Sequence, residues 1–224
     1  MNAKTSLLAI TSLLGTLSVQ AETIAEYTFD SNSVVSTDTS TYSSASAFQT
    51  LNGTFTSNEA QVTADITSNS TNPSDPPAYF SFSFTVQNLD AGETLDLTSL
   101  TLLFATDSVT ADLGVYTDAV GYTGTGDKIG AYTHGNTSSY DLVTVDLTAT
   151  NSVVASSLTG LTNGETIDFR FTIGDRGNNN ASKIYHIDDV NLSGTVSAIP
   201  EPGTFALLAG ASALLWIAIR KRLS

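Results

Sequence analysis

Apolar and polar side chains alternate in short runs along the middle of the chain, between about residues 22 and 198. The clearest runs are 80–86, 143–147 and 167–173, in which every second residue is apolar. A period of two places the apolar side chains on one face of an extended strand. Each run is therefore predicted to be an antiparallel strand with one buried and one solvent-facing side. No segment of this region has the apolar spacing of an amphipathic helix.

Weaker or interrupted strand patterns fill the rest of this region. They lie at 23–29, 47–55, 61–66, 95–104, 113–116, 128–132 and 183–192. A turn or a bulge is predicted at Asn52-Gly53. The alternation breaks between Leu97 and Leu100, which predicts a bend there. It also breaks between Ile187 and Val190, so burial of both requires a bulge at the two aspartates between them. About nine or ten short strands without a helix predict an all-β fold, a jelly-roll-like antiparallel β-sandwich over residues 22–197.

Residues 1–21 have the pattern of a signal peptide. Lys4 supplies the positive charge near the start, residues 7–17 form an apolar core, and small residues around Ala21 provide a cleavage site. We therefore expect the chain to be exported and this segment to be removed.

The C-terminal segment, residues 198–224, combines a pair of prolines, an apolar run and a basic cluster. The apolar run, about 204–219, is predicted to form a short hydrophobic helix that inserts into a membrane with some bilayer thinning. The basic cluster would then stay on the cytoplasmic side, which puts the middle of the chain outside. The flanking residues are Pro200, Glu201 and Pro202 before the run and Arg220, Lys221 and Arg222 after it.

In this order, and together with an export signal, the tail resembles the PEP-CTERM sorting domain of Gram-negative bacteria. The resemblance covers about residues 199–222 and implies that an exosortase, a membrane transpeptidase, recognises the tail and cuts near Pro200-Glu201-Pro202. It also implies a protein anchored transiently in the inner membrane and then found at the cell surface or in the extracellular matrix. An ordinary C-terminal membrane anchor is the alternative interpretation.

The middle of the chain is similar, more loosely, to the jelly-roll domains of exported PEP-CTERM proteins and of carbohydrate-binding modules. The similarity rests on residues 79–86, 97–100 and 185–192. It implies an alternative function, in which the domain recognises an exopolysaccharide or an environmental glycan. Fold alone does not fix function, so this remains an analogy at the sequence level.

Charge and composition narrow the function classes. The formal net charge is −14 at pH 7. That charge opposes binding to nucleic acid or to an anionic membrane surface, since both require a basic face. The chain has no cysteine, which excludes thiol catalysis and cysteine-based zinc sites. An exported domain without disulfides depends on its hydrophobic core, with or without a bound metal.

Three aspartates are candidate ligands for a structural calcium ion. A bulge at Asp188 and Asp189 would aim a carboxylate out of the strand, and Asp30 follows the first predicted strand. Ca²⁺ prefers oxygen ligands of this type. In the alternative interpretation these side chains cap turns or face water. No other cofactor is expected.

Two sets of polar and aromatic residues are candidates for contact with a glycan. Arg176, Asn178 and Asn179 lie in a predicted polar loop and carry hydrogen-bond donors and acceptors. Four tyrosines offer ring faces for sugar stacking, although such residues are also common as half-buried strand residues. They are Tyr116, Tyr122, Tyr132 and Tyr140.

No motif selects a reaction. His134 and His186 are not spaced as transition-metal ligands, and a structural hydrogen-bonding role is expected for His186. Many acids are present, but nothing in the sequence selects a glycosidase pair, and a nucleophile elbow is absent. We therefore expect an exported, non-enzymatic surface or matrix protein, with a carbohydrate-binding module as the alternative and a small glycan hydrolase as a third hypothesis.

Overall fold

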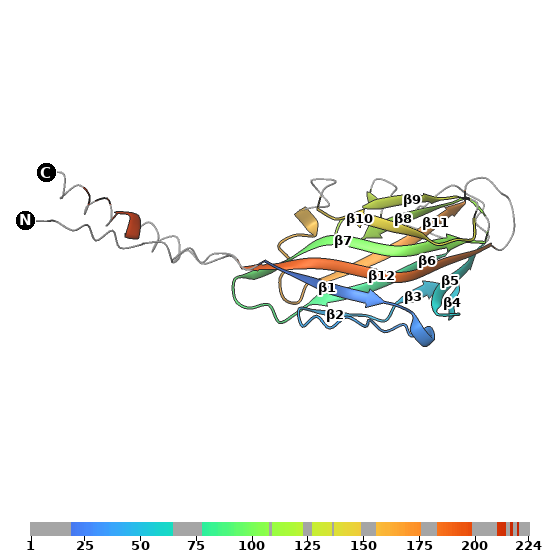
Figure 1. Ribbon diagram of the computed structural model, residues 1–224, viewed down its shortest axis with the longest axis horizontal. Coiled ribbons are helices and arrows are strands. Elements are labelled where there is room, and N and C mark those ends of the chain that lie inside the picture. The colour runs from blue at the N-terminus through green and yellow to red at the C-terminus, as the bar shows by residue number, and fades with distance from the viewer. Residues whose placement is uncertain are drawn as a thin grey trace, which may run out of the picture.

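The alternating runs form strands that assemble into two antiparallel β-sheets packed face to face (Figure 1). The computed structural model describes residues 19–64, 78–107, 109–122, 127–135, 137–148, 156–175 and 183–198, together with residues 210–213, 216 and 219. The prediction of an all-β antiparallel sandwich is confirmed in these residues. Most of the predicted signal peptide, the Pro-Glu-Pro motif and the basic cluster lie outside them.

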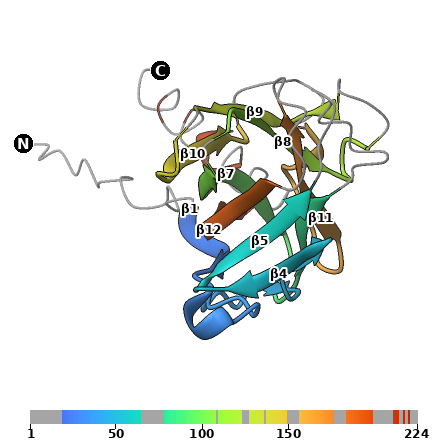
Figure 2. The same cartoon turned by 90° about the vertical axis from the view of Figure 1, so that its right-hand side faces the viewer.

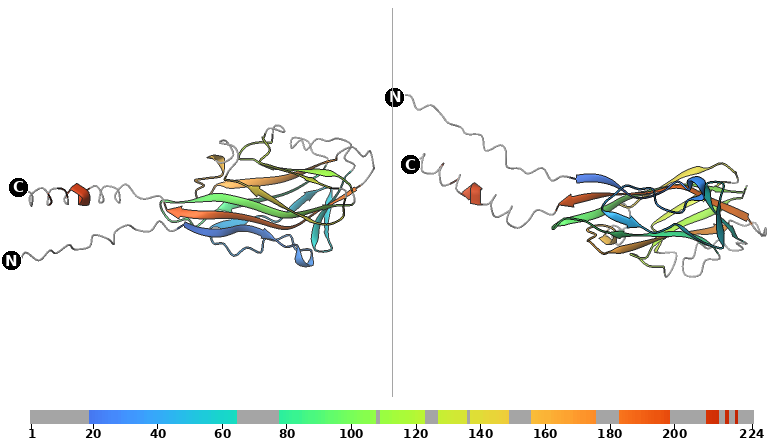
Figure 3. Two further views of the ribbon diagram at one scale, coloured as in Figure 1. Left: turned by 45° about the horizontal axis from the view of Figure 1, so that its top comes forward. Right: turned by 90° about the horizontal axis from the view of Figure 1, so that it is seen from below.

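The first sheet, sheet A, has the strand order β10-β7-β12-β5-β4, and β1 also pairs with β12. Its strands are β1 (Val19–Tyr27), β4 (Gly53–Thr56), β5 (Glu59–Ala64), β7 (Glu93–Thr106), β10 (Asp141–Asp146) and β12 (Lys183–Ala198). β12 pairs with β7 along one edge, and its other edge is shared between β5 and β1. Figure 3 shows β1 and β12 side by side.

The second sheet, sheet B, has the order β2-β6-β11-β8-β9, and β3 also pairs with β6. Its strands are β2 (Ser43–Ala45), β3 (Gln49–Leu51), β6 (Tyr79–Val86), β8 (Ala111–Thr117), β9 (Gly130–His134) and β11 (Thr166–Asp175). A one-turn 3-10 helix, η1 (Asp30–Asn32), follows β1. β6 and β11 form the centre of this sheet and hold the residues of the candidate site.

Aromatic rings fill the space between the two sheets. β6 alternates strictly between buried and half-buried residues, as its sequence predicts. Phe82 of β6 and Phe169 of β11 stack with their ring centroids 5.2 Å apart. Phe48, between β2 and β3, lies against rings from β1, β6 and β11. A core of this kind, rather than disulfides, therefore stabilises a domain without cysteine.

Both predicted interruptions of the strand pattern are present. In β7 the register with β12 shifts at Thr98, which has no partner residue in β12. Leu97 and Leu100 are therefore both fully buried. In β12 the register shifts between Asp188 and Asn191, and Asp189 has a positive φ of 46°. Such bulges add one residue to a strand and change which face its side chains take. They allow apolar pairs that break the alternation to remain in the core.

The predicted strand at 47–55 is in fact two strands in different sheets. β3 pairs with β6 of sheet B, whereas β4 pairs with β5 of sheet A. The chain crosses between the sheets at Asn52, which has a left-handed φ of 58°, and Gly53. β4 and β5 lie at the end of the sandwich that faces the viewer in Figure 2. A weak alternation in the sequence thus marks a corner rather than one strand.

Substitution of Gly53 by alanine is expected to destabilise the fold by about 1–3 kcal/mol, since overpacking in a dense region has this cost. A Cβ at this position would lie 2.3 Å from the backbone oxygen of Gln61 and 2.7 Å from Cγ1 of Val62. Thermal unfolding would measure the loss. Gly135→Ala is the matched control, because a Cβ there meets nothing within 4 Å. Equal unfolding temperatures of the two variants would contradict the close approach at the corner.

The two ends of the sandwich sequence lie next to each other. β1 begins at Val19, within the predicted signal peptide, and Val19 pairs with Ser197 of β12. β12 extends to Ala198, beyond the predicted end at Leu192. Within the described residues, none of the helices has the length and apolar character needed to span a membrane. The predicted helix at about 204–219 is described only at residues 210–213, 216 and 219.

Candidate functional site

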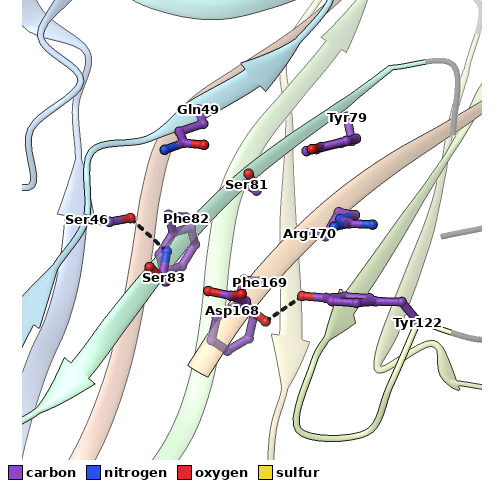
Figure 4. Close-up of a pocket in the computed structure, with 10 residues that line it drawn as sticks. All are labelled: Ser46, Gln49, Tyr79, Ser81, Phe82, Ser83, Tyr122, Asp168, Phe169 and Arg170. Carbon is purple, nitrogen blue, oxygen red and sulfur yellow. Dashed lines mark hydrogen bonds between the residues drawn. The ribbon is translucent and has the colours of Figure 1, made fainter. Parts of the chain in front are cut away.

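A hollow of about 300 Å³ opens on the outer face of sheet B, away from the core (Figure 4). Its lining comes from β6, β11, the segment between β2 and β3, β3 itself and the turn after β8. The lining residues are Ser46, Gln49, Tyr79, Ser81, Phe82, Ser83, Tyr122, Asp168, Phe169 and Arg170. Its volume is at the small end of the range for small-molecule sites, about 300–1,000 Å³.

The floor of the hollow follows from strand alternation and register. Phe82 and Phe169 point into the core, so the residues on either side of them point outward. Asp168 pairs with Ser83 and Arg170 pairs with Ser81 in the antiparallel ladder. Two charged and two hydroxyl side chains therefore lie together on one small area of the sheet.

One wall is formed by the segment between β2 and β3. The amide of Ser46 donates to the carbonyl oxygen of Ser83 over 2.7 Å, and the amide of Ser83 donates to Oγ of Ser46 over 2.9 Å. Gln49, in β3, pairs with Ser81. These bonds fix the wall to β6, so its side chains are held in place beside the floor.

The opposite wall is the turn after β8, which folds over β11. The hydroxyl of Tyr122 donates to the carbonyl oxygen of Asp168 over 3.0 Å, as Figure 4 shows. Oδ1 of Asp118 accepts from the amide of Asp168 over 2.8 Å. Gly121, with a φ of 116°, allows the backbone to turn back just before Tyr122. The turn thus places an aromatic ring against the charged side chains of β11.

Arg170 lies between two tyrosine rings. Its guanidinium carbon is 4.6 Å from the ring centroid of Tyr79 and 4.3 Å from that of Tyr122. Both distances are within the range of cation–π contact. Burial, followed by the negative charge of Asp118, raises the pKa of Tyr122, while Arg170 acts in the opposite direction. The phenol therefore remains protonated and donates to Asp168, and the guanidinium is held between the two rings.

Asp168 supplies the carboxylate of the hollow. Burial and the nearby charge of Asp118 raise its pKa, whereas a hydrogen bond from Ser83 and the charge of Arg170 lower it. Among the described lining residues it is the one carboxyl group. Glycoside hydrolysis commonly uses two carboxyl groups about 5–9 Å apart. The described lining therefore offers both acceptors and donors of hydrogen bonds.

The structure separates the tyrosines that the sequence offered as one stacking platform. Tyr122 lines the hollow, but Tyr116 is fully buried. The hydroxyl of Tyr132 donates to Oδ2 of Asp141 over 2.7 Å, and the hydroxyl of Tyr140 donates to the carboxylate of Glu59 in β5. Sequence analysis missed Tyr79, which begins the most regular strand and so was read only as part of a half-buried face. Arg176, Asn178 and Asn179, the predicted glycan contacts, lie outside the described residues.

The predicted calcium ligands lie close enough to interact. Burial is the main cause that raises the pKa of Asp188 to about 6, and the charges of Asp189, Glu59 and Asp30 contribute. Among the described residues, however, there is no group of three or more histidine and acidic side chains arranged to hold a metal. Calcium binding at Asp30, Asp188 and Asp189 stays a prediction.

His186 has the structural role expected from the sequence. Its Nδ1 lies 2.9 Å from Oε1 of Glu59 in β5, and its Nε2 lies 3.4 Å from Oδ1 of Asp107 after β7. The imidazole thus links three segments on the outer side of sheet A.

Asp188→Asn is expected to stabilise the protein at about pH 8 and to have little effect at about pH 4. The folded-state pKa of Asp188 is raised from 3.8 to about 6. The stabilising contribution of Asp188 is thus complete at a pH below its pKa in the unfolded chain. It is lost as the pH rises through its pKa in the folded protein. Solvent screening reduces this effect, so we expect Asp188→Asn to raise the free energy of unfolding by about 1–2 kcal/mol at the higher pH.

Thermal unfolding in chelator at both pH values measures this effect, and an equal shift at each pH would contradict it. Repetition with added calcium tests the metal site. Calcium bound to Asp188 should raise the unfolding temperature of the natural chain more than that of Asp188→Asn. An unchanged unfolding temperature of the natural chain would contradict calcium binding.

Fold and site together define an all-β sandwich with a polar and aromatic hollow on one outer face. No family model matches the chain, and no curated protein matches it. Several solved structures do. A structure of CBM4 has 16% identity and a TM-score of 0.36 over 66% of this chain and 77% of that one.

Two further structures have comparable scores. CBM29_1, a family 29 carbohydrate-binding module from Piromyces equi, has 13% identity and a TM-score of 0.32 over 79% of this chain and 91% of that one. The K3 cleaved adhesin domain of Lys-gingipain from Porphyromonas gingivalis W83 has 13% identity and a TM-score of 0.33 over 60% and 72%. At this level of similarity the neighbours do not define the function of this chain.

Proposed function

We propose that this chain is an exported, non-catalytic protein whose jelly-roll-like β-sandwich binds carbohydrate in the hollow on sheet B. The observation that carries the proposal is Arg170, held between the rings of Tyr79 and Tyr122 with Asp168 beside it on the same strand. The guanidinium offers several N–H donors in a fixed plane, and the carboxylate accepts hydrogen bonds. Together they supply both halves of the hydrogen bonding that sugar hydroxyls require.

The remaining lining fits the same class of ligand. Ser46, Ser81, Ser83 and Gln49 carry neutral groups that can donate or accept. Small-molecule sites combine apolar or aromatic walls with a few convergent polar groups. A nucleic-acid ligand is disfavoured by the formal net charge of −14, because phosphate binding requires a basic surface.

The direct test is binding of the full chain to a panel of soluble and insoluble glycans, by pull-down and by titration calorimetry. Binding that a substitution in the hollow removes, with the fold intact, supports the proposal. A folded chain that binds no glycan in either assay refutes it.

The targeting segments support a second part of the proposal, which concerns delivery. The signal-peptide pattern and the tail with Pro200-Glu201-Pro202 favour export and processing by an exosortase, with transient anchoring in the inner membrane. After removal of residues 1–21, β1 would begin at Glu22, which pairs with Gly194 of β12, so the chain would still enter and leave the sandwich at the same end.

Replacement of Pro200-Glu201-Pro202 by three alanines should leave a tail-bearing precursor in the membrane fraction. Intact mass of the protein from culture medium and cell envelope would show both cleavages. Replacement of the Thr148-Ala149-Thr150 tripeptide by alanines is a control outside the tail. Unchanged processing of the motif variant would refute sorting and leave carbohydrate binding untouched.

A further inference from the structure

The charges in and beside the hollow are not balanced. Arg170 is the one cation among the described lining residues, and Asp168 is the one anion. A second carboxylate, Asp118, lies beside the backbone of Asp168, since it accepts a hydrogen bond from the amide of that residue over 2.8 Å. Two negative charges therefore accompany one positive charge at this position on the sheet.

The pKa values of two side chains in the hollow reflect the charges around them. At Asp168, burial is the largest cause of the raised pKa, and the charge of Asp118 raises that pKa more than Arg170 lowers it. At Tyr122, Asp118 again has a larger effect than Arg170, and Asp168 adds to it. At both positions the nearby carboxylates thus outweigh the charge of Arg170, which makes the local field negative. A ligand with a negative charge would enter this field at a cost.

The position of Arg170 also limits how it can contact a ligand. Tyrosine rings lie 4.6 Å and 4.3 Å from its guanidinium carbon, so its flat faces are occupied. Contact with a ligand must then use the N–H edge of the guanidinium. Asp168 lies two residues away on the same strand, and side chains two residues apart share a face of the sheet. A donor and an acceptor therefore lie on the same face of the strand, where hydroxyl groups of one ligand can contact both.

We infer that the hollow selects neutral sugar units with adjacent hydroxyl groups, and that Asp168 is the residue that excludes acidic sugars. The inference rests on the proposed carbohydrate-binding function and deepens it. One hydroxyl donates to the carboxylate of Asp168 while its neighbour accepts from Arg170. A uronate in the same position would bring a third carboxylate towards Asp168 and Asp118. With a volume of about 300 Å³, the hollow limits this recognition to a short part of the glycan.

The test uses matched pairs of oligosaccharides. Each neutral chain is compared with the same chain oxidised at C6 to the uronate, so that linkage and length stay constant. Titration calorimetry with the full natural chain should give binding of the neutral member at least roughly tenfold tighter than the uronate, because like charges face each other. Higher salt should narrow that difference, since salt screens charge interactions.

Asp168→Asn keeps the shape of the side chain and removes its charge. We expect neutral binding to weaken roughly tenfold, since a hydrogen bond to a charged group is lost, and uronate binding to strengthen. Asp118→Asn should shift the preference in the same direction, so a second variant is available where the first does not fold. Asp112→Asn is the control, because Asp112 lies on the same sheet but lines a separate, smaller hollow. It should leave both affinities unchanged.

The outcomes distinguish the selectivity for neutral sugars from carbohydrate binding itself. Equal or tighter binding of the uronate by the natural chain would overturn the inference and leave carbohydrate binding in place. A neutral preference that persists in both Asp168→Asn and Asp118→Asn would overturn the role of these carboxylates. Failure of every pair to bind the folded natural chain would overturn the proposed function, and the inference with it.

Discussion

Substitution of Phe48 by alanine should destabilise the protein by about 3–5 kcal/mol, the usual cost of removing a buried aromatic ring. Phe48 is 2% exposed, and its ring centroid lies 5.1 Å from that of Tyr27, 5.0 Å from that of Phe29 and 6.0 Å from that of Phe82. Its amide also donates to the carbonyl oxygen of Val34 over 2.8 Å. The ring thus joins a loop to both sheets, and the surrounding strands cannot collapse into the space it leaves.

Chemical denaturation of the natural and variant chains measures the loss. Leu142→Ala is the control, because Leu142 is 67% exposed on the edge strand β10. It should change stability by less than about 0.5 kcal/mol, as is usual for surface substitutions. A Phe48→Ala variant as stable as the control would mean that the aromatic core is not assembled as described.

Replacement of Arg170 by lysine should weaken glycan binding roughly tenfold to a hundredfold, since hydrogen bonds to charged groups contribute about 1.5–3 kcal/mol each. Lysine keeps the positive charge but lacks the planar array of donors, and it stacks less well between the rings of Tyr79 and Tyr122. A loss of affinity would therefore show that binding depends on the geometry of the guanidinium and not only on its charge. Calorimetric titration with any glycan that binds the natural chain provides the measurement.

The control for this substitution is Lys183→Gln, which removes a cation at the start of β12 in the other sheet. Its glycan affinity should match that of the natural chain. Unfolding temperature and circular dichroism of each variant verify that the fold is retained. Full affinity in a folded Arg170→Lys variant would exclude the tyrosine-held guanidinium as the binding element.

The sequence predicts the strands well where one face is buried and the other is polar. β6, β10 and β11 all follow clear alternation, and both bulges were predicted from pairs of apolar residues that break it. The turn or bulge predicted at Asn52-Gly53 is where the 47–55 run divides into β3 and β4, but their membership of different sheets was not predicted, because the local pattern does not record which sheet a strand joins. The extension of β12 to Ala198 was missed because its last residues are mostly small and polar.

The candidate site was harder to predict, because its residues are distant in sequence. Tyr122 was identified as a candidate ring, but Asp168 and Arg170 looked like the solvent-facing half of an alternating strand. Only the register between β6 and β11 brings these side chains next to Ser81 and Ser83. The contact of Tyr122 with Asp168 likewise depends on a hydrogen bond between residues that are far apart in the sequence. Pairing of this kind leaves no local signature in a single sequence.

The position of β12 within sheet A has a consequence for biosynthesis. β12 lies between β7 and β5, and β1 joins the sheet only through it. Until β12 is available, the other five strands remain as two separate pairs and a single strand. Because β12 is also the last of the described strands in chain order, sheet A cannot close before almost every residue up to Ala198 has been made. Folding should therefore be slow and post-translational, as expected for a chain dominated by long-range pairing, and the incomplete chain has to be kept from aggregating until then.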